Sequence, residues 1–453
     1  GAPNLIRDAR YSTMTATDPD VNEDPYRSNE DEFPLVLTST HSGILPSDLV
    51  LSLKSLSSDT SSFWTSGRVP RLSRVPSGRY FYKKFVSRSV PCVVSVGDGT
   101  FRRRKGAGRV PHMPAGLTVD DLIRVMGQDA KVTVDLTPDG RGDCVRNVEG
   151  RTGDVERMFL RPMEVTMTMG DFVQGMRTSE AAAVAGGAVD NRVSESKPFP
   201  VRRDGSGTKV PDALTLPSEL DDDQSAVFYY SRQNDCVRKE LPSLFATGLI
   251  PSNIPFAAEA FEDSDGSDSD GSDSDGPSTR PLAEPEAINL WVGGSRSVSA
   301  EHRDPYENIF YVCSGTKIFD LRPPSDVGFL REAEFTAGAF AFDRDAGGWH
   351  VVPDGENTVR WIDSSDCDNP EASCGTPSRH IRVKVRAGEM IYIPSLWFHR
   401  VSQTEETVGV NYWFDMVFDA KWCYYNFVGT VGALLHDNLK KRRQKEAEDE
   451  TGA

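Results

Sequence analysis

Three side chains of this 453-residue sequence could together bind a metal ion. His302 and Asp304 stand two positions apart in the triplet HRD, and His399 follows much later in the segment GEMIYIPSLWFHRV. Two imidazoles and one carboxylate form the 2-His-1-carboxylate facial triad of non-heme Fe(II) oxygenases, which leaves positions open for a cosubstrate and O₂. Residues i and i+2 of a β-strand point to one face, so an H-x-D on a strand can direct both side chains at one metal. The pattern predicts a metal site completed from another strand.

The segments around these side chains are typical of β-structure. PYENIFYVCSGTKIFDL, after Asp304, predicts a strand, a Ser-Gly turn and a second strand, while AGEMIYIP and VGVNYWFDM, on either side of His399, predict two more. An H-x-D triplet is common by chance, but these surroundings favour the metal site. The other histidines are expected to be ordinary surface residues, because they lie outside the β-rich region or in loop-like or edge-like stretches: His41, His112, His350, His380 and His436.

Three of these segments also carry a resemblance to a known family. HRDPYENIFYVCSGTKIF, AGEMIYIPSLWFHRV and VGVNYWFDM resemble the JmjC (cupin-type) oxygenases, and among them the small group around JmjC domain-containing protein seven, a lysyl hydroxylase. Further similar segments, such as INLWVGGSRSVSAEHRD, VTVDLTPDGRGDCV and FYYSRQNDCVRKELPSLF, extend the resemblance over residues 42–430. It implies a mainly β fold with flanking helices, in which a double-stranded β-helix (jelly roll) core follows an N-terminal α+β extension.

The resemblance also implies the roles of individual residues. His302, Asp304 and His399 are expected to bind Fe(II), with 2-oxoglutarate and O₂ as cosubstrates. Lys317, after the Ser-Gly turn, is expected on a strand that pairs back against the one leaving His302, where it would hold the far carboxylate of 2-oxoglutarate. The alternative is a solvent-facing strand lysine.

Three further positions match residues that line the cosubstrate pocket of the family: Ser299, Asn308 and Asn411. For the two asparagines the alternative is a structural role, in which they satisfy buried backbone groups. One departure from the family lies in TPDGRGD, where Arg141 stands at a position that often holds a tyrosine reaching the cosubstrate.

The activity implied by the resemblance is hydroxylation of a lysyl side chain, carried by a GTP-binding protein. One alternative is an N-methyl-lysine demethylase of the same superfamily, although no CxxC pair of a zinc-containing reader domain is present. A second alternative is a non-catalytic cupin-fold binding protein, which would be expected to have lost a ligand or the lysine. No HExxH motif of a metalloprotease occurs.

Composition restricts the partners and the compartment. The net charge is −17, but eight carboxylates with no basic residue between them fall within residues 259–275, so the acidity is largely local. It still argues against a nucleic-acid surface, which would be basic. No apolar run reaches the roughly 18 residues of a membrane span.

Seven cysteines without a CxxC pair argue against a secreted disulfide framework and predict a reducing compartment, the cytoplasm or the nucleus or both. The sequence leaves the oligomeric state open.

The sequence divides into five regions by composition and pattern. We expect a disordered tail (1–35), an N-terminal α+β part (42–257) containing a loop or insert (178–215), an acidic disordered insert (258–284), the β-helix core (285–419), and a C-terminal helix with a polar tail (420–453). The repeat EDSDGSDSDGSDSDG within the acidic insert lacks the twelfth-position acid and the flanking helices of a calcium-binding EF-hand, so disorder is the expectation.

Overall fold

The computed structural model of the chain describes most of its residues. The described residues are 46–64, 68–96, 113–185, 198–202, 214–215, 226–261, 282–330, 332–343, 348–362 and 381–451. The predicted N-terminal tail (1–35) lies outside them, as do residues 262–281 of the predicted acidic insert.

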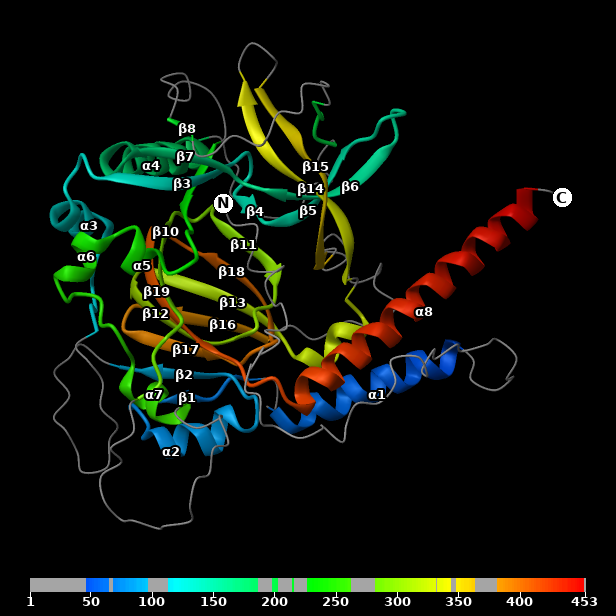
Figure 1. The fold of residues 1–453 in the computed structure, drawn as a ribbon, viewed down its shortest axis with the longest axis horizontal. Coiled ribbons are helices and arrows are strands. Elements are labelled where there is room, and N and C mark those ends of the chain that lie inside the picture. The colour runs from blue at the N-terminus through cyan, green and yellow to red at the C-terminus, as the bar shows by residue number, and fades with distance from the viewer. Residues whose placement is uncertain are drawn as a thin grey trace, which may run out of the picture.

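Two sheets packed face to face form the centre of the molecule (Figure 1). One contains four antiparallel strands in the order β17-β12-β19-β10, and the other four in the order β16-β13-β18-β11. Their bounds are β10 (Ala287–Gly293), β11 (Val298–His302), β12 (Tyr306–Ser314), β13 (Thr316–Arg322), β16 (Ile381–Arg386), β17 (Glu389–Ile393), β18 (Phe398–Gln403) and β19 (Thr407–Asp415). This arrangement confirms the predicted double-stranded β-helix and the mainly β fold class with flanking helices.

The sequence patterns of the two sheets differ because their outer faces differ. β10 and most of β19 are buried on both faces, since helices cover the outer face of the larger sheet, and these strands are almost continuously apolar. In β16 of the smaller sheet, buried Val383 and Val385 alternate with exposed Arg382 and Lys384. Apolar side chains from both sheets, among them Phe319, fill the space between them.

The predicted pairing of the strand that carries Lys317 is wrong. β12 pairs with β17 and β19, whereas β13 pairs with β16 and β18 in the other sheet. The Ser-Gly turn therefore passes the chain from one sheet to the other, and Gly315 supports this change with a φ of 74°. Consequently Lys317 faces a ligand strand, β18, and not the strand that leaves His302.

The N-terminal part extends the larger sheet at both edges and covers its outer face. β2 (Cys92–Ser95) and β1 (Arg71–Leu72) continue one edge, and β9 (Val227–Tyr230), β3 (Lys131–Thr137), β7 (Met163–Thr168) and β8 (Leu214–Thr215) continue the other. The covering helical segments are α2 (Gly78–Phe81), a π-helical turn (Tyr82–Val86), α3 (Val119–Met126), α4 (Met169–Ala185), α5 (Cys236–Lys239), α6 (Pro242–Ala246) and α7 (Pro255–Phe261). Residues such as Phe81, Phe172 and Phe256 are fully buried in this second core.

Two predicted boundaries in this part are wrong. The loop or insert predicted over 178–215 begins as helix, because the alanine-rich stretch continues α4 to Ala185. The acidic insert predicted to begin at 258 also starts as helix, since the apolar residues of α7 extend to Phe261.

A third sheet stands beside the open end of the β-helix. Its order is β15-β14-β6-β5, with bounds β5 (Cys144–Glu149), β6 (Val155–Arg161), β14 (Glu332–Asp343) and β15 (Gly348–Ile362). The short β4 (Arg141–Gly142) precedes β5 and pairs with β11 of the smaller sheet. The sequence did not indicate β15, because much of it is polar and exposed.

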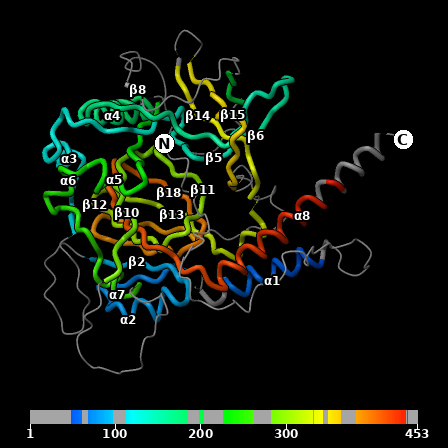
Figure 2. The backbone as a smooth tube through the Cα atoms, viewed as in Figure 1, coloured from blue at the N-terminus to red at the C-terminus, as the bar shows by residue number. Residues whose placement is uncertain are grey.

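Two long helices lie side by side at the lower right of Figure 1: α1 (Pro46–Trp64) and α8 (Ala420–Thr451). Both pack on a short 3₁₀ helix, η3 (Pro324–Gly328), and Leu53 of α1 shares a small buried cluster with Leu435 of α8. The tube in Figure 2 shows the first half of α8 running beside α1. Among the described residues, no helix has the length and apolar composition that crossing a membrane would require.

Candidate metal and cosubstrate site

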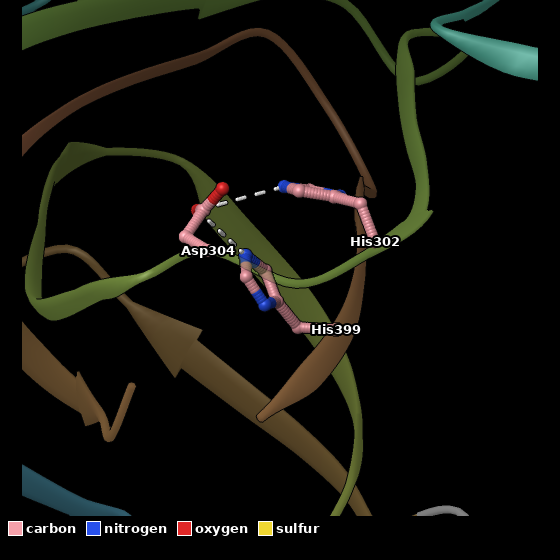
Figure 3. A group of neighbouring side chains, drawn as sticks. All are labelled: His302, Asp304 and His399. Atoms are coloured by element: carbon pink, nitrogen blue, oxygen red, sulfur yellow. Dashed lines mark ion pairs between the residues drawn. The ribbon is translucent and has the colours of Figure 1, made fainter. Parts of the chain in front are cut away.

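The β-helix brings the three predicted metal ligands together at its open end (Figure 3). His302 is the last residue of β11, and it lies directly opposite His399 of β18. Asp304 Oδ2 lies 3.8 Å from His302 Nε2 and 3.6 Å from His399 Nε2. The ligand atoms of all three residues lie within 4.8 Å of one another, so one ion could contact all of them.

Asp304 reaches this position differently from the prediction. The expectation that H-x-D lies on one strand is wrong for its last residue, because β11 ends at His302 and Asp304 belongs to the connection to β12. The loop before β18 holds it there: the Leu396 N–H donates to the Asp304 carbonyl oxygen at 3.0 Å. Leu396 is fully buried and has a φ of 67°, an unfavourable conformation for leucine that the surrounding packing must enforce.

The backbone also orients both imidazoles. His302 Nδ1 lies 2.7 Å from the Ala300 carbonyl oxygen, and His399 Nδ1 lies 3.0 Å from the Trp397 carbonyl oxygen. A carbonyl only accepts hydrogen bonds, so each Nδ1 carries the proton and each Nε2 presents a lone pair to the centre. Burial, reinforced by the charge of His302, lowers the pKa of His399 to about 4. His399 is therefore neutral at neutral pH, as a metal ligand must be.

One orphan atom tests whether the residues fit a metal ion. Asp304 Oδ2 is buried and has no hydrogen-bond partner within the described part of the chain. A buried carboxylate oxygen without a partner is costly, yet here it faces two imidazole lone pairs that cannot donate to it. A cation shared by the three atoms removes this conflict, and the donor set of two nitrogens and one carboxylate suits Fe(II). The residues present therefore fit the predicted metal.

Lys317 lies in the interior of the same β-helix. Its side chain is 1% exposed, which rules out the alternative of a solvent-facing lysine. Nζ donates to Gln403 Oε1 at 2.5 Å and to the Tyr229 hydroxyl at 3.3 Å. Burial lowers the pKa of Lys317 to about 7, and no carboxylate of the described residues forms an ion pair with it. A buried ammonium that lacks an anion is suited to bind an anionic ligand.

The other three predicted pocket residues line the same interior but have different neighbours. Ser299 of β11 is close enough to the Tyr229 hydroxyl to lower its pKa, although burial is the larger effect and raises it, and so Ser299 joins the group around Lys317. Asn411 Nδ2 donates to Asn308 Oδ1 at 3.4 Å, and Asn411 Oδ1 accepts from Trp291 Nε1 at 3.0 Å. The two asparagines are buried and partly satisfied by each other, so the structure is compatible with both their structural role and contact with a cosubstrate.

The sequence analysis missed Tyr229 and Gln403. Arg141, at the position where the family often has tyrosine, begins β4 and pairs with Val298, whereas the hydroxyl beside Lys317 comes from Tyr229 of β9. A period-two signal was available for Gln403, because it lies four residues after His399 and so faces the same side of β18. Tyr229 could not be found this way, since its position depends on the pairing of β9 with β10.

The third sheet forms one wall of the candidate metal site. Trp361 of β15 stacks on His302 with a ring-centroid distance of 6.2 Å and an interplanar angle of 9°. Asp143, between β4 and β5, is close enough to His302 for their charges to interact, although burial is the larger effect and raises the pKa of Asp143 to about 6. An aromatic ring and a carboxylate thus lie beside the metal ligand His302.

A β-helix holding a His-Asp-His cluster and a buried lysine defines a class of cupin-type proteins, and the comparison with family models agrees with this. The model of the cupin-like domain matches residues 78–420, and the chain belongs to this family.

Within this family, the individual relatives that resemble the chain are JmjC proteins. The chain is 29% identical over 402 residues to lysine-specific demethylase JMJ32 of Arabidopsis thaliana, covering 84% of this chain and 92% of the relative. It is 27% identical to JmjC domain-containing protein E of Dictyostelium discoideum, covering 78% and 86%. It is 26% identical to the human bifunctional peptidase and (3S)-lysyl hydroxylase JMJD7, covering 80% and 89%. These similarities support the general activity of a JmjC dioxygenase and include both hydroxylase and demethylase relatives.

Proposed function

We propose that this protein is an Fe(II)- and 2-oxoglutarate-dependent hydroxylase of lysyl side chains in proteins. One observation carries the proposal: a single β-helix interior contains the clustered ligand atoms of His302, Asp304 and His399 together with the buried ammonium of Lys317. The first group suits Fe(II), and the second suits the far carboxylate of a dicarboxylic cosubstrate. A non-catalytic binding protein would not need to keep both.

Each residue has a definable task in this reaction. When bound, Fe(II) supplies the activation of O₂ that accompanies decarboxylation of 2-oxoglutarate to succinate and CO₂. The triad would hold the ion through two Nε2 atoms and Asp304 Oδ2. Lys317 would attract the far carboxylate, with the Tyr229 hydroxyl beside it, while Gln403 fixes the position of Nζ. The aromatic rings around Lys317 exclude water, which strengthens the attraction.

The lysyl substrate is supported by the human relative, whose name includes lysyl hydroxylase, and by Asp143. This carboxylate is close enough to His302, Arg161 and Arg232 for their charges to interact with it, and its place beside the metal ligands suits it to receive a substrate ammonium. The family resemblance extends the proposal to a GTP-binding protein as carrier of the lysine, located in the cytoplasm or the nucleus. Free thiols at the described Cys92, Cys144 and Cys236 are consistent with such a reducing compartment.

Demethylation of N-methyl-lysine is the second candidate, because the Arabidopsis relative is named as a lysine-specific demethylase. The two reactions differ only in the C–H bond that is attacked. Oxidation of an N-methyl group gives a hemiaminal, which releases formaldehyde, whereas oxidation of a side-chain methylene gives a stable alcohol.

Mass spectrometry of matched peptides separates the two candidates. The Fe(II)-loaded protein would be incubated with 2-oxoglutarate and a lysyl peptide library in unmethylated and N-methylated form. A gain of about 16 Da on unmethylated lysine, with no change in a library carrying norleucine for lysine, is the expected result. A loss of about 14 Da confined to the methylated library would favour the demethylase.

A further inference from the structure

The residue between two of the metal ligands is held by the C-terminal helix. Arg303, which separates His302 from Asp304, donates from Nε to the Tyr425 hydroxyl of α8 and from Nη2 to Glu332 Oε1 of β14 at 2.9 Å. Its guanidinium also lies over the Tyr425 ring, with Cζ at 4.8 Å from the centroid. The backbone on both sides of Arg303 carries a ligand, so these contacts restrain the position of His302 and Asp304.

Tyr425 also contacts the segment of the third ligand. Its ring packs against Phe398, the residue immediately before His399, with centroids 6.2 Å apart. Trp422, one turn earlier on α8, stacks on Tyr425 at 6.1 Å and 13° and so fixes the ring plane. Tyr425 therefore touches a neighbour in sequence of every metal ligand.

A second contact joins the first turn of α8 to the same site. Lys421 Nζ donates to Ser395 Oγ at 2.7 Å and lies 3.6 Å from Glu307 Oε1. The buried Glu307 carboxylate accepts hydrogen bonds from the Ser395 N–H and the Ser395 hydroxyl. Ser395 precedes Leu396, whose N–H holds the Asp304 carbonyl oxygen. Both ends of the segment around Asp304 are thus tied to α8.

We infer that the first turns of α8 belong to the metal centre, with Tyr425 as a positioning residue that acts through Arg303. Without the Tyr425 hydroxyl, the partly buried Nε–H of Arg303 loses its acceptor, and a guanidinium with an unsatisfied donor will move to find another. Movement of Arg303 displaces Asp304, which has no hydrogen bond of its own at Oδ2. The inference rests on the proposed metal centre, and it names the contacts that hold His302 and Asp304 in position to bind the ion.

Two conservative variants of α8 test this inference. Tyr425→Phe removes the buried hydroxyl, and Tyr424→Phe is the matched control, because Tyr424 is 69% exposed. Titration of the apoprotein with Co(II), followed by d–d absorption, measures affinity and coordination geometry without any turnover. We expect Tyr425→Phe to raise the Co(II) Kd on the order of tenfold and to change the spectrum, as for other groups that orient metal ligands. Tyr424→Phe should leave both unchanged.

Thermal unfolding of the apoproteins separates positioning from simple stabilisation. A lower melting temperature of Tyr425→Phe with an unchanged Co(II) Kd and spectrum would overturn the inference, since Tyr425 would then be structural only. Failure of the wild type to bind Co(II) would overturn the metal centre and this inference together. Wild-type binding with normal binding by Tyr425→Phe would overturn the inference alone.

A double variant tests the route through Arg303 and does not depend on a single substitution. Arg303→Lys keeps the positive charge but loses the Nε donor. If Tyr425 acts through Arg303, the Co(II) affinity of Arg303→Lys/Tyr425→Phe should match that of Arg303→Lys within about twofold, because the second change removes a contact already lost. Independent, multiplicative losses would contradict this route.

Discussion

The Tyr229 hydroxyl lies 3.3 Å from Lys317 Nζ, although the two residues are 88 positions apart in the chain. Gln403 approaches the same Nζ from β18 at 2.5 Å, so polar groups of two strands, β9 and β18, converge on one buried ammonium. Neither partner carries a negative charge. The ammonium is therefore positioned but not neutralised, which is the arrangement required of a site that must still accept an anion.

Replacement of Lys317 should strongly weaken binding of the cosubstrate 2-oxoglutarate. In Lys317→Ala a carboxylate entering the site would be desolvated without a countercharge, and truncating one partner of such a buried pair costs about 2–5 kcal/mol, or roughly 30-fold to several thousand-fold in Kd. Calorimetric titration of the Mn(II)-loaded protein with 2-oxoglutarate measures the effect. Lys384→Ala is the control, because this exposed lysine lies on β16, the strand beside β13. Equal affinity of Lys317→Ala and wild type would remove Lys317 from the site.

The Tyr229 hydroxyl should contribute less than Lys317 to the affinity for 2-oxoglutarate. Tyr229→Phe keeps the ring but loses a hydrogen bond next to a charged group, so we expect 2-oxoglutarate affinity to fall by about 1.5–3 kcal/mol. Tyr230→Phe offers a matched control, because Tyr230 faces the other core on the opposite side of β9. An effect as large in Tyr230→Phe would show that general loosening of β9, and not the hydroxyl at Lys317, weakens binding.

Cosubstrate binding should depend on pH in a defined direction. Burial lowers the pKa of Lys317 in the absence of cosubstrate to about 7, from its ordinary value of 10.5, and a bound carboxylate favours the protonated form. The Kd of 2-oxoglutarate should therefore be constant below about pH 7 and rise above it by up to about tenfold per pH unit. Calorimetry at about pH 8, in buffers of different ionisation enthalpy, should show uptake of roughly one proton. Lys317→Arg should show none, because arginine remains protonated.

The lowered pKa of Lys317 should also make the free energy of unfolding depend on pH when no cosubstrate is bound. Between about pH 7 and 10.5 the unfolded chain binds more protons at Lys317 than the folded protein does. The free energy of unfolding should therefore gain from this group as pH rises through that window, and the cost of the buried charge should be fully present below it. Denaturant titrations at several pH values in this range give the free energy of unfolding of wild type and of Lys317→Met. Plotted against pH, this free energy should rise more steeply for the wild type. Parallel plots would contradict the lowered pKa of Lys317.

Asp304→Asn should separate metal binding from folding. The amide has nearly the same shape but removes a buried charge whose Oδ2 has no hydrogen-bond partner in the described structure. We expect the apoprotein to be at least as stable as wild type, with a gain of up to about 1 kcal/mol. Co(II) affinity should fall by more than the roughly 100-fold known for residues that only support a ligand. Asp437→Asn, exposed on α8, is the control, and tight Co(II) binding by Asp304→Asn would exclude Asp304 as a ligand.

Local sequence patterns were sufficient to predict the β-helix and the three side chains of the candidate metal site. Strands such as ENIFYVC and EMIYIP are short apolar runs with flanking turns, and His399 follows the second of them after four residues. The turn of the chain between sheets at Gly315 and the place of Asp304 beyond its strand were not predictable in this way. Both depend on how strands distant in sequence pair, as does the approach of Tyr229 to Lys317.

The link between Arg303 and Tyr425 was also beyond the sequence. The sequence predicted a C-terminal helix in this region, but it could not show which residues that helix contacts. Only the packing of α8 on the loop before β18 brings Tyr425 to the segment between His302 and Asp304.

Succinate formation from 2-oxoglutarate by the anaerobically Fe(II)-loaded protein, after admission of O₂, tests the account most directly. Wild type, His302→Ala and Lys317→Ala would be compared with and without the lysyl peptide library. The account predicts Fe(II)-dependent succinate in the wild type, increased by peptide, and its loss in both variants. Succinate formation that persists in His302→Ala, or a metal-loaded wild type that does not bind 2-oxoglutarate, would contradict it.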